Sequence, residues 1–133
     1  MILYLDASAL VKRYLAEEGS QLVRDLMREA DGWAMCRIGY VETVRAITLA
    51  AGRRAARRID DEWSAIDVIE VDDALVRDAA GLATSHDLRS LDALHLAAAR
   101  LLRRPELLLA TWDVRLHAAA IATGLRAVPE RLA

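Results

Sequence analysis

The sequence predicts an α/β fold of three layers, in which helices cover both faces of a central, mainly parallel sheet of four to five strands. Short apolar runs such as residues 1–5 and 107–111 alternate with longer segments of helical pattern, and this alternation is typical of parallel sheets. The runs are apolar at nearly every position, as expected for strands buried on both faces. No repeat or linker interrupts the pattern, so residues 1–133 are expected to form one domain.

The first half of the chain predicts two strands and several helices. Residues 1–5 form the first strand, and Ser8 is placed to cap the helix that follows, because a serine hydroxyl accepts backbone hydrogen bonds at a helix start. Glycines at positions 19, 32 and 52 mark breaks between elements. The predicted helices run to about residue 17, from 21 to 30, from about 39 to 51 and from 52 to about 65, and the second strand covers residues 33–36.

The second half continues the alternation of strands and helices. Residues 67–71 are predicted as the third strand, and Asp73 as the cap of the next helix. Ser90 opens a further helix, which Pro105 stops because proline cannot continue the hydrogen-bonding pattern. The remaining predicted elements are a fourth strand at 107–111, a last helix at 114–123 and a short edge strand at 126–128.

Composition sets limits on the class of protein. The chain is 55% hydrophobic without any Phe, so its core must be aliphatic, and a net charge of −2 neither demands nor excludes a nucleic-acid partner. The single Cys36 cannot form an internal disulfide, which fits a reducing compartment. No secretory signal or membrane-spanning run is predicted, and a cytoplasmic protein is therefore expected.

Four carboxylates lie where acids are hard to justify. Asp6 ends the first strand, Glu42 and Asp92 fall near predicted helix starts in apolar surroundings, and Asp113 follows the fourth strand. Acidic side chains are rarely buried unless they are paired or bind a cation. Each acid also has a simpler interpretation, such as a helix cap for Asp113 or a local i,i+3 pair of Asp92 with His95.

If the four acids converge, those simpler interpretations fail together. Two like charges about 4 Å apart repel by roughly 4 kcal/mol at an effective dielectric constant near 20, so a cluster is stable only when it is protonated or bound to a cation. Oxygen ligands select Mg²⁺ or Mn²⁺, whereas zinc prefers His or Cys. The three histidines show no spacing typical of zinc ligands.

Four segments carry a resemblance to a known family, and together they extend over essentially the whole chain. They are Tyr4-Leu5-Asp6-Ala7-Ser8-Ala9-Leu10-Val11-Lys12, Tyr40-Val41-Glu42-Thr43-Val44-Arg45-Ala46, Leu91-Asp92-Ala93-Leu94-His95-Leu96-Ala97 and Thr111-Trp112-Asp113-Val114-Arg115-Leu116. In this order they resemble the acidic motifs of PIN domains, in particular the VapC-type toxins of bacterial toxin–antitoxin pairs. One departure is that some relatives carry a further acid shortly after the fourth, where this chain has Arg115, Leu116 and His117.

The resemblance implies an endoribonuclease that cleaves RNA with Mg²⁺ or Mn²⁺ held by Asp6, Glu42, Asp92 and Asp113. Ser8 and Thr111 would orient carboxylates or bound water. It further implies a homodimer, a VapB-like antitoxin, and inhibition of translation and growth by the free toxin. The alternative is a catalytically inactive PIN scaffold that acts through protein or RNA binding.

Several basic residues are candidates for RNA contact. Lys12 and Arg115 lie close in sequence to two of the acids, and an arginine-rich segment forms two i,i+4 stripes on one predicted helix, which suits a phosphate backbone. Solvated faces, with the arginines paired to nearby acids, explain them equally well. The arginines of this segment are Arg53, Arg54, Arg57 and Arg58.

Three other classes with similar features are excluded by their motifs. A haloacid-dehalogenase-like phosphatase needs a second aspartate where this chain has Ser8, and a receiver domain needs a late lysine, whereas Lys12 is the only one. A dinucleotide-binding domain needs a glycine-rich turn after the first strand, and residues 6–9 contain no glycine.

Overall fold

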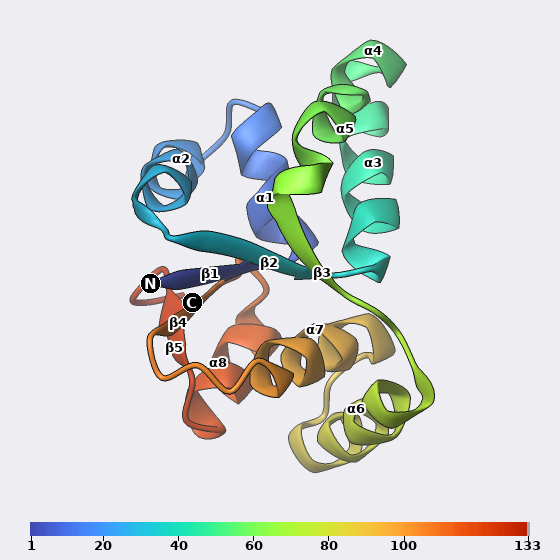
Figure 1. Cartoon of the computed structure of the whole chain (residues 1–133), viewed down its shortest axis with the longest axis vertical. Coiled ribbons are helices and arrows are strands. Elements are labelled where there is room, and N and C mark those ends of the chain that lie inside the picture. The colour runs from blue at the N-terminus through green and yellow to red at the C-terminus, as the bar shows by residue number, and fades with distance from the viewer. Residues whose placement is uncertain (133) are drawn as a thin grey trace.

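The computed structural model describes residues 1–132 and confirms the predicted three-layer class. All five strands run parallel in a single sheet of order β3-β2-β1-β4-β5 (Figure 1). The strands are β1 (Ile2–Leu5), β2 (Gly32–Cys36), β3 (Ile66–Ile69), β4 (Leu107–Ala110) and β5 (Arg126–Val128).

Helices cover both faces of the sheet, with the first five on one side and the last three on the other (Figure 1). Across the described residues, no helix is long and apolar enough to cross a membrane. The first layer holds α1 (Ala7–Tyr14), α2 (Ser20–Glu29), α3 (Ile38–Ala51), α4 (Arg53–Ala56) and α5 (Arg58–Glu62). The second holds α6 (Asp73–His86), α7 (Ser90–Leu101) and α8 (Val114–Ala122).

The strand alternation divides the core between the two faces. Leu3 and Leu5 of β1 pack with the first helical layer, whereas Tyr4 packs with the second, because successive side chains of a strand point to opposite faces. Both sets are fully buried. Strand β1 therefore presents an aromatic hydroxyl to the α7 side and aliphatic groups to the α1–α3 side.

Two helix caps lie one or two residues before their predicted positions. Asp6, not Ser8, caps α1, and Asp72, not Asp73, caps α6, each accepting a hydrogen bond from the backbone N–H three residues on. Both aspartates have extended backbone, as a cap requires. Ser8 lies inside α1, where its hydroxyl is free to bind other groups.

The segment 52–65 was wrongly predicted as one helix. It consists of α4, α5 and a short 3₁₀ turn at Trp63–Ala65. Its path follows its buried contacts: Ile59 is fully buried, and Glu62 binds Arg13 and Tyr14 of α1. Strand β3 also ends two residues earlier than predicted, at Ile69, where its pairing with Cys36 ends.

Gly19 offers a test of how the α1–α2 turn packs. Its φ is +89°, and a Cβ added there would lie 2.6 Å from the ring of Trp112, next to Asp113. Gly19→Ala should destabilise the protein by more than about 1 kcal/mol, the approximate cost of left-handed backbone for an L-residue, with the ring clash in addition. Denaturant unfolding measures the effect.

Gly81→Ala is the matched control, because Gly81 lies within α6 and an added Cβ meets nothing within 4 Å. It should stabilise the protein by about 0.5–1 kcal/mol through helix propensity. Equal effects of the two substitutions would contradict the described turn.

Candidate active site

The site lies at the carboxyl edge of the sheet, where β1 and β4 end side by side. Leu5 pairs with Ala110, and the backbone N–H of Asp6 donates to the carbonyl of Ala110 at 3.3 Å. The residues that follow the two strands, Asp6 and Thr111, are thereby brought into contact. Ligands of open α/β sheets bind at this edge.

Asp6 is 4% exposed, and three donors hold its carboxylate. Ser8 Oγ at 2.6 Å and the N–H of Ala9 at 3.0 Å donate to Oδ1, while Thr111 Oγ1 donates to Oδ2 at 2.6 Å. Burial raises the pKa of Asp6, and His95 and the three donors oppose that rise. Ser8 and Thr111 thus make the contacts with a carboxylate that the sequence predicted for them.

Asp113 and Asp92 are joined by an arginine that the sequence analysis did not single out. Arg89 donates from Nη2 to Asp113 Oδ2 at 2.8 Å and from Nε to Asp92 Oδ2 at 3.2 Å. Burial and the neighbouring Asp113 raise the pKa of Asp92, and Arg89 opposes them. Asp113 also caps α8 through Oδ1, which accepts from Leu116 N–H at 2.9 Å, so its predicted capping interaction exists beside its contact with Arg89.

Glu42 lies in the second turn of α3, half-buried, with Oε1 2.7 Å from His95 Nε2. The other ring nitrogen of His95 lies 2.7 Å from the hydroxyl of Tyr4. His95 makes these contacts in place of the predicted pair with Asp92, which binds Arg89 instead. Hydrogen bonds thus link Asp6 with Asp113 through Thr111, Asp113 with Asp92 through Arg89, and Glu42 with α7 through His95.

The donor set suits a hard divalent cation, since it consists of carboxylate oxygens with hydroxyl support. Within residues 1–132, however, no three His, Cys, Asp or Glu side chains are arranged to hold a metal ion. Arg89 supplies the positive charge between Asp92 and Asp113. The chemistry of the side chains fits Mg²⁺ or Mn²⁺, and Arg89 occupies one oxygen each of Asp92 and Asp113.

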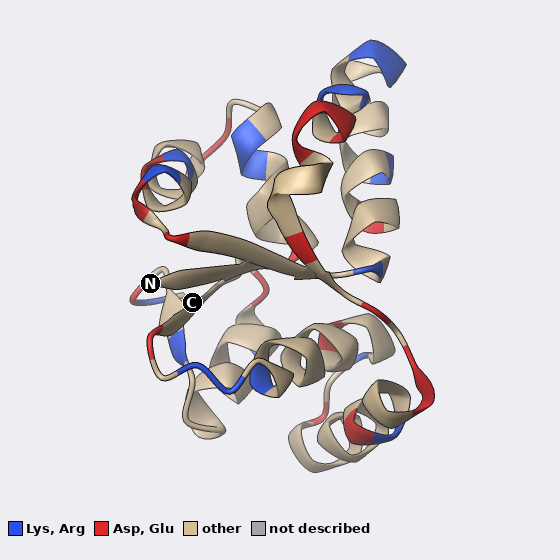
Figure 2. Ribbon diagram, viewed as in Figure 1, with Lys and Arg blue, Asp and Glu red and all other residues tan. Residues whose placement is uncertain are grey.

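Two of the candidate RNA-binding residues, Lys12 and Arg58, contact other residues of the protein. Lys12 is 7% exposed, and its ammonium group binds Glu17 and the carbonyl of Glu18 and lies 4.7 Å from the Trp112 ring. Arg58 lies over the ring of Tyr14. Arg53, Arg54 and Arg57 are exposed but do not share one helix with Arg58, and Figure 2 shows the basic residues of α4 at the tip farthest from the sheet.

Arg115 is exposed in the first turn of α8, two residues after the cap residue Asp113. Its contact with RNA stays a prediction. The next two residues are buried, unlike Arg115. Leu116 is fully buried, and His117 Nε2 lies 2.6 Å from the carbonyl oxygen of Pro129. Neither of these positions offers an acid to the site.

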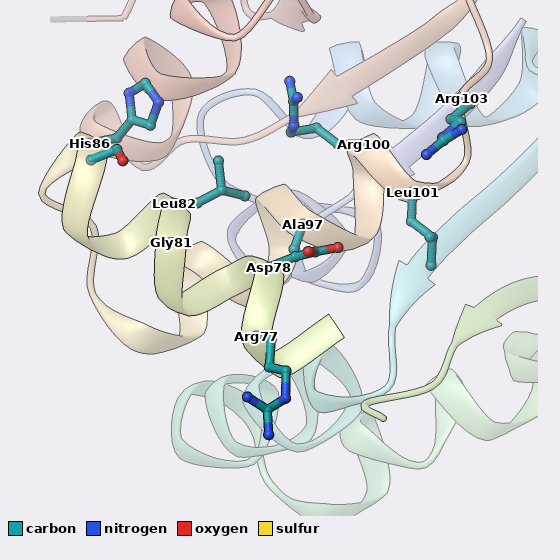
Figure 3. A pocket seen from close by; sticks show the side chains of 10 residues that line it. Arg77, Asp78, Gly81, Leu82, His86, Ala97, Arg100, Leu101 and Arg103 are labelled. Atoms are coloured by element: carbon teal, nitrogen blue, oxygen red, sulfur yellow. The ribbon is translucent and has the colours of Figure 1, made fainter. Parts of the chain in front are cut away.

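A separate groove of about 500 Å³ lies between α6 and α7 (Figure 3). Arg77, Arg100, Arg103 and His86 line it, with Asp78 as its acid. None of the four site carboxylates contributes to it. This groove is therefore distinct from the candidate active site.

Comparison with known proteins identifies the family. Residues 3–123 match the PIN domain. The chain is 38% identical to Ribonuclease VapC45 of Mycobacterium tuberculosis (strain CDC 1551 / Oshkosh), covering 98% of this chain and 97% of the relative. The chain therefore belongs to the PIN-domain family and, within it, to the VapC group.

Two solved structures share the fold. Mycobacterium tuberculosis VapC20, described as a toxin that cleaves the sarcin–ricin loop, has a TM-score of 0.75 at 18% identity, covering 88% of this chain and 94% of that one. A toxin–antitoxin complex from Klebsiella pneumoniae has a TM-score of 0.69 at 19% identity, covering 87% and 90%. The architecture is thus shared with VapC structures.

Asp92 provides a test of charge strain in the metal-free protein. Folding raises the pKa of Asp92, so above the unfolded pKa of about 3.9 the native state binds more protons than the unfolded state. The contribution of Asp92 to the free energy of unfolding therefore falls as pH rises through its folded pKa. In EDTA at pH 7, Asp92→Asn should therefore raise the melting temperature by a few degrees, and the gain should shrink toward pH 4.

Asp72→Asn is the control, since it removes one exposed negative charge at a helix cap outside the site, where Asn caps as well as Asp. Its effect should stay within about 0.5 kcal/mol, as for ordinary surface substitutions. Marked destabilisation by Asp92→Asn would show that the carboxylate is a structural group whose charge the fold needs.

Proposed function

We propose that this VapC-group protein is a metal-dependent endoribonuclease that hydrolyses RNA phosphodiester bonds with Mg²⁺ or Mn²⁺. The observation that supports the proposal is a set of contacts near the carboxyl edge of the sheet. Thr111 links Asp6 with Asp113, Arg89 links Asp113 with Asp92, and Glu42 binds His95 of α7. The curated relative that covers nearly the full chain is named a ribonuclease, which supports this reaction class.

Asp6, Glu42, Asp92 and Asp113 are proposed to hold the ion. A bound divalent cation lowers the pKa of its water and neutralises charge on the phosphoryl and leaving oxygens. Asp6 is kept in one orientation by its three donors, among which Ser8 and Thr111 are the proposed supporting hydroxyls. Arg89 is proposed to leave its bridge when the ion binds, and its guanidinium group would then be available to bind a phosphate of the RNA.

RNA contact is proposed for the exposed arginines rather than for Lys12. Arg115 follows Asp113 by two residues at the start of α8, and Arg53, Arg54 and Arg57 are exposed on the segment around α4. Arginine suits phosphate because its planar group donates two parallel hydrogen bonds. Lys12, with its donors bound to Glu17 and Glu18, is left out of this set.

The protein is further proposed to act in the cytoplasm as the toxin of a toxin–antitoxin pair. The printed description of the Klebsiella pneumoniae neighbour, a toxin–antitoxin complex, supports a protein partner. Exposed apolar side chains such as Val41 and Leu49 on α3 offer surface for a VapB-like antitoxin or a second copy of the chain. Free toxin is then expected to inhibit translation and growth.

The decisive experiment incubates purified protein with a mixture of cellular RNAs in Mg²⁺, in Mn²⁺ and in excess EDTA. Cleavage is expected only with metal. Asp6→Asn should lose more than about 100-fold of the rate, because loss of a group that merely supports a ligand already costs about 10–100-fold.

Asp72→Asn serves as the matched control and should cleave like the wild type. Millimolar Mn²⁺ should raise the melting temperature of the wild type and of Asp72→Asn but not of Asp6→Asn, since an ion that binds only the native state stabilises it. Cleavage by Asp6→Asn, or cleavage in EDTA, contradicts the proposal. A metal shift without any cleavage favours the inactive scaffold.

A further inference from the structure

A buried chain of hydrogen bonds connects the sheet to Glu42. The N–H of Cys36, at the end of β2, donates to the hydroxyl oxygen of Tyr4 at 3.0 Å. That oxygen lies 2.7 Å from His95 Nδ1, and His95 Nε2 lies 2.7 Å from Glu42 Oε1. The chain crosses four elements, β2, β1, α7 and α3, and ends on a carboxylate of the candidate active site.

Burial removes water as an alternative partner along this chain. Tyr4 is 0% and His95 1% exposed, and the two rings meet edge to face with centroids 5.9 Å apart. A buried donor or acceptor without a partner costs free energy that water cannot repay. Each N–H or O–H proton in this series of hydrogen bonds therefore needs an acceptor among the residues that form it.

This requirement fixes the direction of each hydrogen bond. The N–H of Cys36 can only donate, so the Tyr4 oxygen accepts there, and its own hydrogen has one acceptor left, the Nδ1 of His95. The ordinary pKa of a phenol is about 10, so at neutral pH the Tyr4 hydroxyl keeps that hydrogen. With Nδ1 as acceptor, the proton of a neutral His95 ring lies on Nε2 and is donated to Glu42.

We propose that Tyr4 and His95 are positioning residues for Glu42: Tyr4 holds His95 in its Nε2–H tautomer, and His95 holds Oε1 of Glu42 so that Oε2 faces the site. This inference rests on the proposed function, because it treats Glu42 as a ligand of the divalent ion. Glu42 is half-buried at the edge of the site and has several rotatable bonds. An anchored oxygen keeps the carboxylate in one orientation before the ion arrives.

The tautomer itself is measured first, by ¹⁵N NMR of the histidine rings in the metal-free protein at neutral pH. His95 is expected to show a protonated Nε2 and an unprotonated Nδ1. In Tyr4→Phe, which lacks the donor to Nδ1, the signals should shift toward a mixture of tautomers. A protonated Nδ1 in the wild type overturns the inference.

Two substitutions of His95 separate its two hydrogen bonds. Asparagine places an acceptor oxygen the same number of bonds from the backbone as Nδ1, so His95→Asn retains the contact with Tyr4 and loses Glu42. Glutamine places an N–H group the same number of bonds away as Nε2, so His95→Gln retains the contact with Glu42 and loses Tyr4. Each variant leaves a buried amide, which makes the two a matched pair.

Mn²⁺ titration by calorimetry compares these variants with the wild type. His95→Asn should lose about 10–100-fold in affinity, the range for residues that support a metal ligand, whereas His95→Gln should lose less than about threefold. His86→Asn, at the last residue of α6, should bind like the wild type. Melting in EDTA checks that both His95 variants fold, and equal losses of affinity overturn the inference.

Failure of this inference and failure of the proposed function are distinguishable. If the wild type cleaves RNA with metal but both His95 variants lose affinity for Mn²⁺ equally, the positioning role is wrong and the proposed function stands. If the tautomer and the difference between the variants are as expected but the wild type does not cleave RNA, the proposed nuclease function is wrong and the positioning role stands.

Discussion

Burial of the Asp6 carboxylate is the constraint on which the site depends. The parallel pairing of β1 with β4 removes Asp6 from water, and its oxygens then need donors from the protein. Those donors come from α1 and from the residue after β4, so the carboxylate joins a helix start to a second strand end. Thr111 in turn accepts the N–H of Asp113, and the position of the fourth acid therefore follows from that of the first.

The four acids are satisfied in three different ways. Asp6 binds hydroxyl and backbone donors, Asp92 and Asp113 share Arg89, and Glu42 binds His95. A cluster of acids needs protonation or positive charge, and in the metal-free protein Arg89 supplies that charge to Asp92 and Asp113. The metal-free fold is thus less strained than four acids alone would make it.

The helices, the strands and the four candidate acids could be predicted from the sequence, because all of them depend on local sequence patterns. Apolar runs predicted β1 and β4, and the positions of Asp6 and Asp113 after these runs indicated that both acids lie at the carboxyl ends of strands. The caps were misplaced because aspartate and serine are both good caps, and the local sequence does not decide between them. The contacts of Tyr4 with His95, of His95 with Glu42 and of Arg89 with Asp113 were missed because they join residues 91, 53 and 24 positions apart. The contact of Arg89 with Asp92 is a local i,i+3 pair.

One signal for His95 was nevertheless present. Asp92 and His95 lie three residues apart, so they share one face of α7 and both point toward the sheet. The sequence suggested that they bind each other, but the fold gives each an outside partner at the same edge. Strand β1 explains why, since its alternation directs Tyr4 toward α7 and its end places Asp6 in the site. The same four-residue strand thus fixes one acid directly and a second through the histidine it holds.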